Sequence, residues 1–355
     1  MVILNRYLAI QVCVGLLIAT ATLLPLFSFF DFQDQLDDVG TGTYQTWDAF
    51  MYTVLLSPRR FIQLVPFIVL LGNVVALGRL ATRLELTSMR AAGMSPLKIN
   101  AAPLAVGVIV LVAMTLMDEY LAPKLQQQAI EQRNSALGLS VELGANLGTW
   151  TRDEREILRI GQMDYGSRAR DVDIFRFADD GSMSAHIHAG IADIITNDLW
   201  ILSDVVERTF TPSGDITTRR MENLSWDSFL QPREISTLTK PPDSLSVSEL
   251  FRYVNYLQDT GQETRAYSLA LWRRAGGIFT TLAMILLSLP FVFGSVRQGL
   301  GNKLVMAALA GLGAYLFDQI MANAGLLLGI SPFLIAMLPG MLLLGIAIYF
   351  FRRIV

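Results

Sequence analysis

Two histidines, His186 and His188, are the side chains in this sequence best suited to binding a metal ion. They stand two residues apart in a run that reads as a β-strand, so both imidazoles would lie on one face of a sheet. Together they could supply two thirds of the protein ligands of a catalytic zinc site. No Cys or carboxylate at ligand spacing completes the set, and we therefore expect no metal site and no cofactor in this chain.

Motifs for nucleotide hydrolysis and for other catalysis are absent from the sequence. A P-loop requires G-x-x-x-x-G-K-[ST], and the nearest match, residues 294–303, has Leu300 where the lysine must stand. Neither H-E-x-x-H nor G-x-S-x-G occurs, which weakens a protease or hydrolase interpretation. Cys13 is the single cysteine, so no intrachain disulfide can form. We expect that the chain is not an enzyme by itself.

Four arginines stand early in long apolar segments, where they could bind an anionic group: Arg59, Arg60, Arg273 and Arg274. Charges at membrane depth are costly and usually face a cavity or a partner. The alternative is that these long side chains extend to the outer interface without binding a ligand. Asp318 lies inside another apolar segment, where it either pairs with a nearby arginine or has a functional role.

A short polar segment, residues 79–98, could contact a cytoplasmic partner. Its residues favour a helix at about 80–95, which Gly93 and Pro96 would end. One interpretation is a solvated helix on the membrane surface. The other is a docking helix, whose contact residues would be Glu85, Leu86, Met89 and Arg90.

These side chains belong to a chain that is too apolar for an ordinary soluble protein. Of its 355 residues, 52% are hydrophobic and 17% are charged, against about 25% charged in typical soluble domains. A helix needs about 20 apolar residues to cross a bilayer, and six stretches qualify: 7–30, 51–78, 100–121, 269–294, 304–328 and 333–351. No basic stripe with interleaved aromatics points to nucleic-acid binding.

The six helices divide three and three around a polar insert. We expect membrane helices 1–3 in residues 1–122, a soluble domain in 123–266 and membrane helices 4–6 in 267–355. Cytoplasmic loops carry an excess of Lys and Arg, and one side of this chain collects Arg6, Arg79, Arg83, Arg90, Lys98, Arg297, Lys303, Arg352 and Arg353. Both termini should therefore be cytoplasmic, and the soluble domain should lie on the outer side, which is the periplasm of a Gram-negative cell.

The soluble domain reads as all-β. Polar and apolar residues alternate in 156–160, 172–177 and 200–206, and Asp180-Gly181 is typical of a turn between strands. Evenly spaced strands without intervening helices predict an antiparallel sandwich or jelly roll. Ser246 and Glu249 form a capping-box pattern, which predicts a short helix leading back to the membrane.

Several short motifs, in order along the whole chain, resemble the LptF/LptG family of lipopolysaccharide-export permeases, and LptG more than LptF. They are Asp34-Gln35-Leu36, Gly42-Thr43-Tyr44, Met51-Tyr52-Thr53, Leu84-Glu85-Leu86, Met89-Arg90-Ala91-Ala92-Gly93, Asp243-Ser244-Leu245-Ser246, Phe291-Val292-Phe293-Gly294 and Leu316-Phe317-Asp318-Gln319-Ile320. Each motif alone is weak, but their order and spacing agree with the topology expected from composition.

This resemblance implies partners and a substrate. The chain would pair with an LptF-like paralogue, and a dimer of an LptB-like cytoplasmic ATPase would use the ATP. An LptC-like protein, anchored by one membrane helix and carrying a jelly roll, would stand beside them. The two permeases would take lipopolysaccharide from the inner membrane and pass it to a periplasmic bridge toward the outer membrane.

The resemblance also implies roles for individual residues. Arg83, Glu85, Leu86, Met89 and Arg90 would couple the chain to the ATPase. Arg59, Arg60, Arg273 and Arg274 would contact lipid phosphates, for which guanidinium groups are suited. Phe27, Phe67, Tyr315 and Phe317 would line the cavity for acyl chains.

One feature departs from the family pattern. Lysines often stand near the outer end of the first helix in the family, whereas this chain has Asp31, Asp37 and Asp38. Phosphate binding would then fall on the second and fourth helices, or on divalent cations that join carboxylate to phosphate.

Two other classes of function are compatible with the same topology. A membrane receptor or sensor could use the outer β domain to bind a partner, although this leaves the 79–98 segment unexplained. A subunit that works on lipoproteins would be expected to have four membrane helices.

Overall fold

The computed structural model describes most of the chain, namely residues 2–138, 141–142, 149–152, 155–164, 168–178, 180–195, 199–211, 215–228, 241–259, 262–293 and 299–352. Within these ranges, six helices are long and apolar enough to cross a membrane, as predicted. Arg353 and residues 294–298, which include Arg297, lie outside the described residues.

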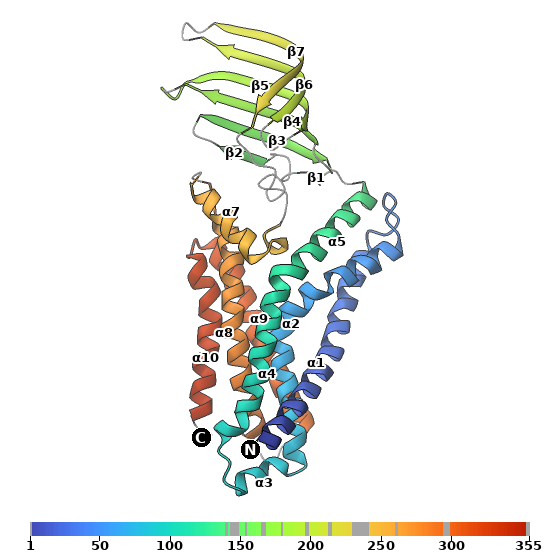
Figure 1. Ribbon diagram of the computed structural model, residues 1–355, viewed down its shortest axis with the longest axis vertical. Helices are drawn as coiled ribbons and strands as arrows, with labels where there is room; N and C mark the ends of the chain where they lie inside the picture. Colours follow the sequence, from blue (N-terminus) through green and yellow to red (C-terminus); the bar gives the residue numbers. More distant parts are fainter. Residues whose placement is uncertain are drawn as a thin grey trace.

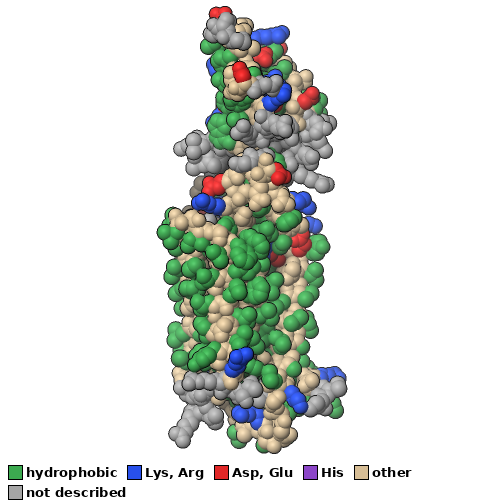
Figure 2. Space-filling view, turned by 90° about the vertical axis from the view of Figure 1, so that its left-hand side faces the viewer, with side chains coloured by type: hydrophobic (Ala, Val, Ile, Leu, Met, Phe, Trp, Pro, Cys, Tyr) green, Lys and Arg blue, Asp and Glu red, His purple; other side chains and the backbone are tan. Residues whose placement is uncertain are grey.

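The membrane helices form a long bundle with the β domain at one end (Figure 1). They are α1 (Val2–Leu36), α2 (Thr46–Thr82), α4 (Pro96–Leu116), α8 (Arg265–Phe293), α9 (Leu300–Leu327) and α10 (Pro332–Arg352). Both termini and the short helix α3 (Glu85–Ala91) lie at the end opposite the sheet. Figure 2 shows hydrophobic side chains covering the middle of the bundle, while charged side chains gather toward its ends.

The third membrane helix continues beyond its apolar run. A π-helical turn, η1 (Met117–Leu121), joins α4 to α5 (Ala122–Leu137), and the amide of Ala122 donates to the Met117 carbonyl five residues back. Pro123 follows directly and has no backbone N–H to donate. Single π turns inside α-helices are rare and are frequently found at functional sites, and this one carries Asp118.

The inserted all-β domain predicted from the sequence is confirmed, and its described strands form one continuous antiparallel sheet in the order β1-β3-β4-β5-β6-β7. Its strands are β1 (Val141–Glu142), β2 (Thr149–Arg152), β3 (Glu156–Asp164), β4 (Arg168–Phe177), β5 (Met183–Ile194), β6 (Leu199–Phe210) and β7 (Ile216–Asp227). β1 and β2 both pair with β3. The three alternating runs noted in the sequence fall in β3, β4 and β6.

One face of this sheet is filled by the domain's own apolar side chains. Ile174 and Ile187 pair across β4 and β5 and are both fully buried. Trp200 and Trp226 pair across β6 and β7, and their rings meet edge to face with centroids 5.4 Å apart. These residues belong to one hydrophobic cluster, so the apolar face of the described sheet is already packed.

Backbone irregularities occur at neighbouring positions of several strands. Asp171 on β4 and Asp204 on β6 have positive φ angles of 53° and 56°. Gly161 and Gly190 lie on the neighbouring strands, and a Cβ on Gly161 would meet the Asp171 carboxylate at 2.6 Å. The alternation changes phase here, because Ala169 and Val172, three residues apart, are both fully buried.

The helix that returns to the membrane begins as the capping-box pattern predicts. In the structure, the Ser246 amide donates to Glu249 Oε2 at 2.8 Å, and the Glu249 amide donates to Ser246 Oγ at 3.2 Å. Helix α7 (Val247–Asp259) follows and is preceded by the short 3-10 helix η2 (Pro242–Ser244). Four side chains at helical spacing along α7 are buried, namely Leu250, Tyr253, Val254 and Leu257.

Close packing of α8 against α10 depends on Gly276. A Cβ at this position would lie 2.3 Å from the Ala336 carbonyl oxygen, whereas a Cβ on the adjacent Gly277 would meet nothing within 4 Å. We expect Gly276→Ala to lower the free energy of unfolding by about 1–3 kcal/mol, as overpacking typically does. Gly277→Ala should leave it unchanged or slightly raise it, because Ala favours helix by up to about 1 kcal/mol over Gly. Thermal unfolding in detergent measures both, and equal midpoints for the two variants would contradict this account.

Candidate functional site

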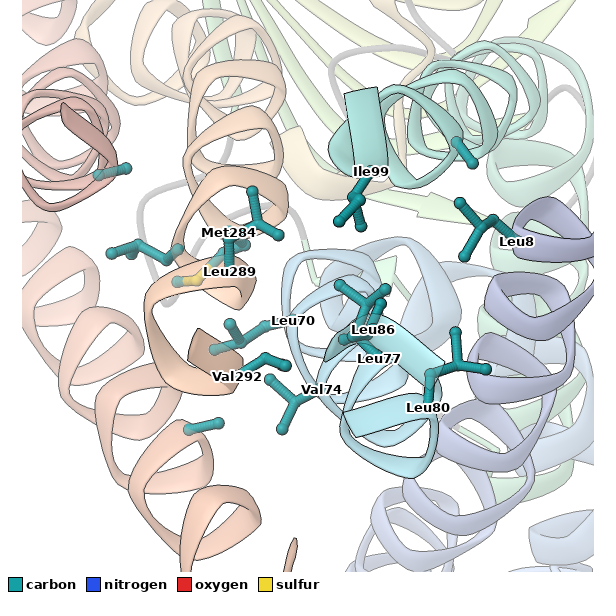
Figure 3. Close-up of a cluster of buried hydrophobic side chains, with 14 of the residues drawn as sticks. Leu8, Leu70, Val74, Leu77, Leu80, Leu86, Ile99, Met284, Leu289 and Val292 are labelled. Carbon is teal, nitrogen blue, oxygen red and sulfur yellow. The ribbon is translucent and has the colours of Figure 1, made fainter. Parts of the chain in front are cut away.

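The candidate coupling site is α3, which is held against the ends of the membrane helices. Leu86 is only 2% exposed and packs in a hydrophobic cluster with side chains of α1, α2, α4 and α8. Figure 3 shows Leu86 near Leu77 in this cluster. Met89 is partly buried against the same cluster. Two of the five predicted coupling residues therefore point into the bundle.

The other three predicted coupling residues are more exposed than Leu86, and Arg83 precedes α3. The Tyr7 hydroxyl of α1 donates a hydrogen bond of 2.7 Å to Glu85 Oε2. The Arg90 guanidinium lies 5.6 Å from the centre of the Phe293 ring at the end of α8. Arg83 is exposed. The structure thus connects α3 to α1 and α8, and the docking role of these residues stays a prediction.

Asp118 is the centre of a buried ion cluster at the other end of the bundle. Arg59 of α2 lies 2.6 Å from its Oδ1, and Arg274 of α8 lies 2.9 Å from its Oδ2. The Asp118 side chain is 7% exposed, and the two arginine side chains are 12% and 11% exposed. One carboxylate therefore holds three membrane segments together through two of the four arginines predicted to bind phosphate.

The same cluster attaches the membrane helices to the segment that returns from the β domain. Arg274 donates to the Leu245 carbonyl at 2.5 Å. Glu119, next to Asp118 on η1, accepts hydrogen bonds from the hydroxyl and the amide of Ser248 at the start of α7. Gln127 of α5 donates to the Ser244 carbonyl. We call Asp118, Arg59 and Arg274, with these attachments, the outer latch.

The remaining two predicted phosphate ligands are also paired with carboxylates, but they are more exposed. Arg60 of α2 forms a salt bridge with Asp31 of α1, and their side chains are 27% and 15% exposed. Arg273 of α8 lies 2.5 Å from Asp318 of α9, and both side chains are about one-third exposed. Pairing with arginine was one of the two interpretations left open for Asp318.

The acidic residues at the end of α1 nearer the β domain differ in their partners. Asp31 pairs with Arg60, and Asp38 lies 2.5 Å from Arg133 of α5. Asp37 is exposed. The first two carboxylates thus neutralise arginines of this chain.

The four predicted acyl-chain residues come from three helices. Phe67 of α2 and Tyr315 of α9 meet edge to face, with ring centroids 5.9 Å apart. Tyr315 is 43% exposed and Phe27 of α1 is 38% exposed. Phe317 of α9 is half-buried. The structure brings Phe67 and Tyr315 together, while Phe27 and Phe317 stand outside that pair.

Sequence reasoning missed Asp118, although a signal was present. It is an acid at the end of an apolar run that is long enough to span a membrane, and such residues usually have a partner. Its partners could not be assigned from the sequence, because Arg59 and Arg274 are 59 and 156 residues away.

Comparison with known proteins agrees with the motifs and with this architecture. Residues 6–353 match the family of lipopolysaccharide export system permeases LptF/LptG. The chain is similar to the lipopolysaccharide export system permease protein LptG of Haemophilus influenzae, with 29% identity over 96% of this chain and 95% of that protein. It is 28% identical to LptG of Escherichia coli K12 over 99% of this chain and 98% of that protein. Because the match covers nearly the whole chain, this protein belongs to the LptF/LptG family of lipopolysaccharide export system permeases.

Proposed function

We propose that this chain, a permease subunit of a lipopolysaccharide-export ABC transporter, is the LptG-like half of a heterodimer with an LptF-like paralogue. The observation that carries the proposal is the family match over residues 6–353. The pair extracts lipopolysaccharide from the inner membrane and passes it to a periplasmic bridge toward the outer membrane. An LptB-like ATPase dimer supplies the energy from the cytoplasm, and an LptC-like protein continues the path.

The proposed orientation places the termini and α3 in the cytoplasm and the β domain in the periplasm. Two observations support it. The termini and α3 lie at the end of the bundle opposite the sheet (Figure 1). The short connections at that end are rich in Arg and Lys, as cytoplasmic loops are.

In the proposed coupling, the exposed side of α3 binds the ATPase and the buried side transmits movement to the bundle. Leu86 and Met89 engage the hydrophobic cluster, so they act as the attachment of α3 to the membrane helices. The residues that contact the ATPase are then Glu85 and Arg90 on α3 and Arg83 just before it. Displacement of α3 would then move α1 through Tyr7 and α8 through Phe293.

In the proposed lipid site, the phosphates contact Arg60 and Arg273 rather than the outer latch. Arg59 and Arg274 are nearly buried on one carboxylate and have little surface left for a ligand. The Arg273–Asp318 pair, by contrast, stays about one-third exposed at membrane depth. Such a pair is costly against lipid tails and favours a surface that faces a polar cavity. Phe67 and Tyr315 supply an apolar wall near the middle of α9 for acyl chains.

Copurified lipid tests this assignment. The chain is purified in mild detergent with its paralogue and ATPase, and bound subunits and lipopolysaccharide are quantified by mass spectrometry. The double variant Arg273→Gln/Asp318→Asn removes the pair without leaving a lone charge. We expect lipid retention to weaken by about tenfold or more, since hydrogen bonds to charged groups contribute about 1.5–3 kcal/mol each.

The matched control is Arg133→Gln/Asp38→Asn, which removes an ion pair between α5 and the segment after α1. This control should retain lipid like the unaltered chain. Equal retention in both double variants would contradict the phosphate assignment. A chain that purifies without ATPase and without glycolipid would contradict the transport proposal and favour the receptor alternative.

A further inference from the structure

The outward face of the β sheet carries a cluster of charged and imidazole side chains that the transport account does not use. Asp173 lies between Val172 and Ile174, which are buried on the opposite, apolar face. The strand register places Asp173 directly across from His188 on β5 and from Arg159 on β3. Asp171 lies two residues before Asp173 on β4, and its carboxylate is near the same His188 ring. The cluster therefore joins three neighbouring strands.

The two carboxylates in this cluster divide their oxygens between two kinds of partner. Arg159 Nη1 lies 2.7 Å from Asp173 Oδ2 and 3.1 Å from Asp171 Oδ2. His188 Nδ1 lies 3.0 Å from Asp173 Oδ1 and 3.9 Å from Asp171 Oδ1. Arg159 thus orients both carboxylates through their Oδ2 atoms, while both Oδ1 atoms lie within 4 Å of His188 Nδ1.

This geometry points to a divalent-cation site of the zinc class formed by Asp171, Asp173 and His188. Single ligand atoms of these residues all lie within 4.8 Å of one another. Zinc binds His nitrogen and carboxylate oxygen at about 2.0–2.2 Å, so three ligands around one ion are separated by little more than 3 Å. Small movements of the three side chains would bring their ligand atoms to that spacing. The fourth position stays open to water.

The surroundings of the three ligands are also those of a metal site. Ligating carboxylates are commonly held by hydrogen bonds from outer groups. Here Arg159 and His186 hold Asp173, and His186 Nε2 lies 2.9 Å from its Oδ1. The His186 ring is itself fixed by stacking on Phe175, with centroids 4.7 Å apart. The Asp171 carboxylate can pack against the backbone of Gly161 because this residue has no side chain.

No metal site was expected from the sequence, because no carboxylate stands at ligand spacing along the chain. The sheet register instead supplies Asp173 and Asp171 from the neighbouring strand.

Zinc binding by the full-length chain tests the site. The protein is purified in detergent, freed of its affinity tag, treated with chelator and dialysed against increasing Zn²⁺, and bound metal is measured by mass spectrometry. His186 and His188 are the only histidines of the chain, so no other imidazole competes. We expect one saturable Zn²⁺ per chain and a higher midpoint of thermal unfolding when Zn²⁺ is bound.

Asp171→Asn and Asp204→Asn form a matched pair of variants. Both positions have φ near +55°, which Asn tolerates, and both lie beside a glycine on the next strand. Only Asp171 belongs to the cluster. Asp171→Asn should lower the zinc affinity by about tenfold or more, and Asp204→Asn should not change it. Absence of saturable binding, or equal binding by both variants, would overturn the proposal.

Discussion

Asp118→Asn is expected to destabilise the membrane bundle more than any other single loss of charge in the described residues. The substitution leaves Arg59 and Arg274, both nearly buried, without their shared counter-charge. Removing one partner of a buried ion pair typically costs about 3–5 kcal/mol. Thermal unfolding of the purified protein in detergent measures the loss. Limited proteolysis of the segment around residues 241–248 should accelerate in parallel, because the outer latch holds that segment.

Asp38→Asn is the matched control for this prediction. Asp38 also pairs with an arginine, Arg133, but the two side chains are 37% and 27% exposed. Partly exposed pairs contribute about 0–1 kcal/mol, so the unfolding midpoint should change little. A midpoint for Asp118→Asn that equals the midpoint of the control would contradict the buried latch.

Glu85→Ala is expected to uncouple ATP hydrolysis from the permease. Glu85 provides the acidic group at the start of α3, in a region otherwise rich in arginine. Truncating a central interface residue costs about 2 kcal/mol or more in binding. The ATPase should therefore dissociate more readily, and lipid-stimulated hydrolysis should fall. Both are measured on the purified complex, by subunit stoichiometry and by phosphate release.

The Tyr7→Phe variant tests whether Glu85 contacts the ATPase directly or only attaches α3 to α1. Glu85 accepts a hydrogen bond from the Tyr7 hydroxyl, and both variants break this bond. Only Glu85→Ala also removes the carboxylate. Tyr7→Phe should therefore keep the ATPase bound. If the two variants lost the ATPase to the same extent, Glu85 would act through α1 and not by contact with the partner.

Local patterns in the sequence predicted local structure well, because the responsible interactions span a few residues. The capping box is the clearest case, since Ser246 and Glu249 are three residues apart and bond each other as expected. The six apolar runs predicted six helices for the same reason. The end of the polar helix α5, at Leu137, could not be read from hydropathy in the same way, because α5 lies beyond the third apolar run.

Contacts between distant segments could not be read from the sequence. Leu86 and Arg90 both lie on α3, but only the packed bundle shows that one faces inward and the other outward. The strand alternation fails at Asp171, because its positive φ shifts the phase of the neighbouring residues. Likewise, the carboxylates near His188 are found only through the pairing of β4 with β5.

ATP-driven release of lipopolysaccharide is the measurement that tests the account most directly. This chain, the proposed LptF-like paralogue and the proposed LptB-like ATPase are reconstituted in vesicles that contain lipopolysaccharide, with the proposed LptC-like acceptor, in soluble form, outside. Lipid transferred to the acceptor is then quantified over time. We expect transfer to require hydrolysable ATP and to fall with Glu85→Ala. Transfer at the same rate without ATP, or ATP hydrolysis without any transfer, would contradict it.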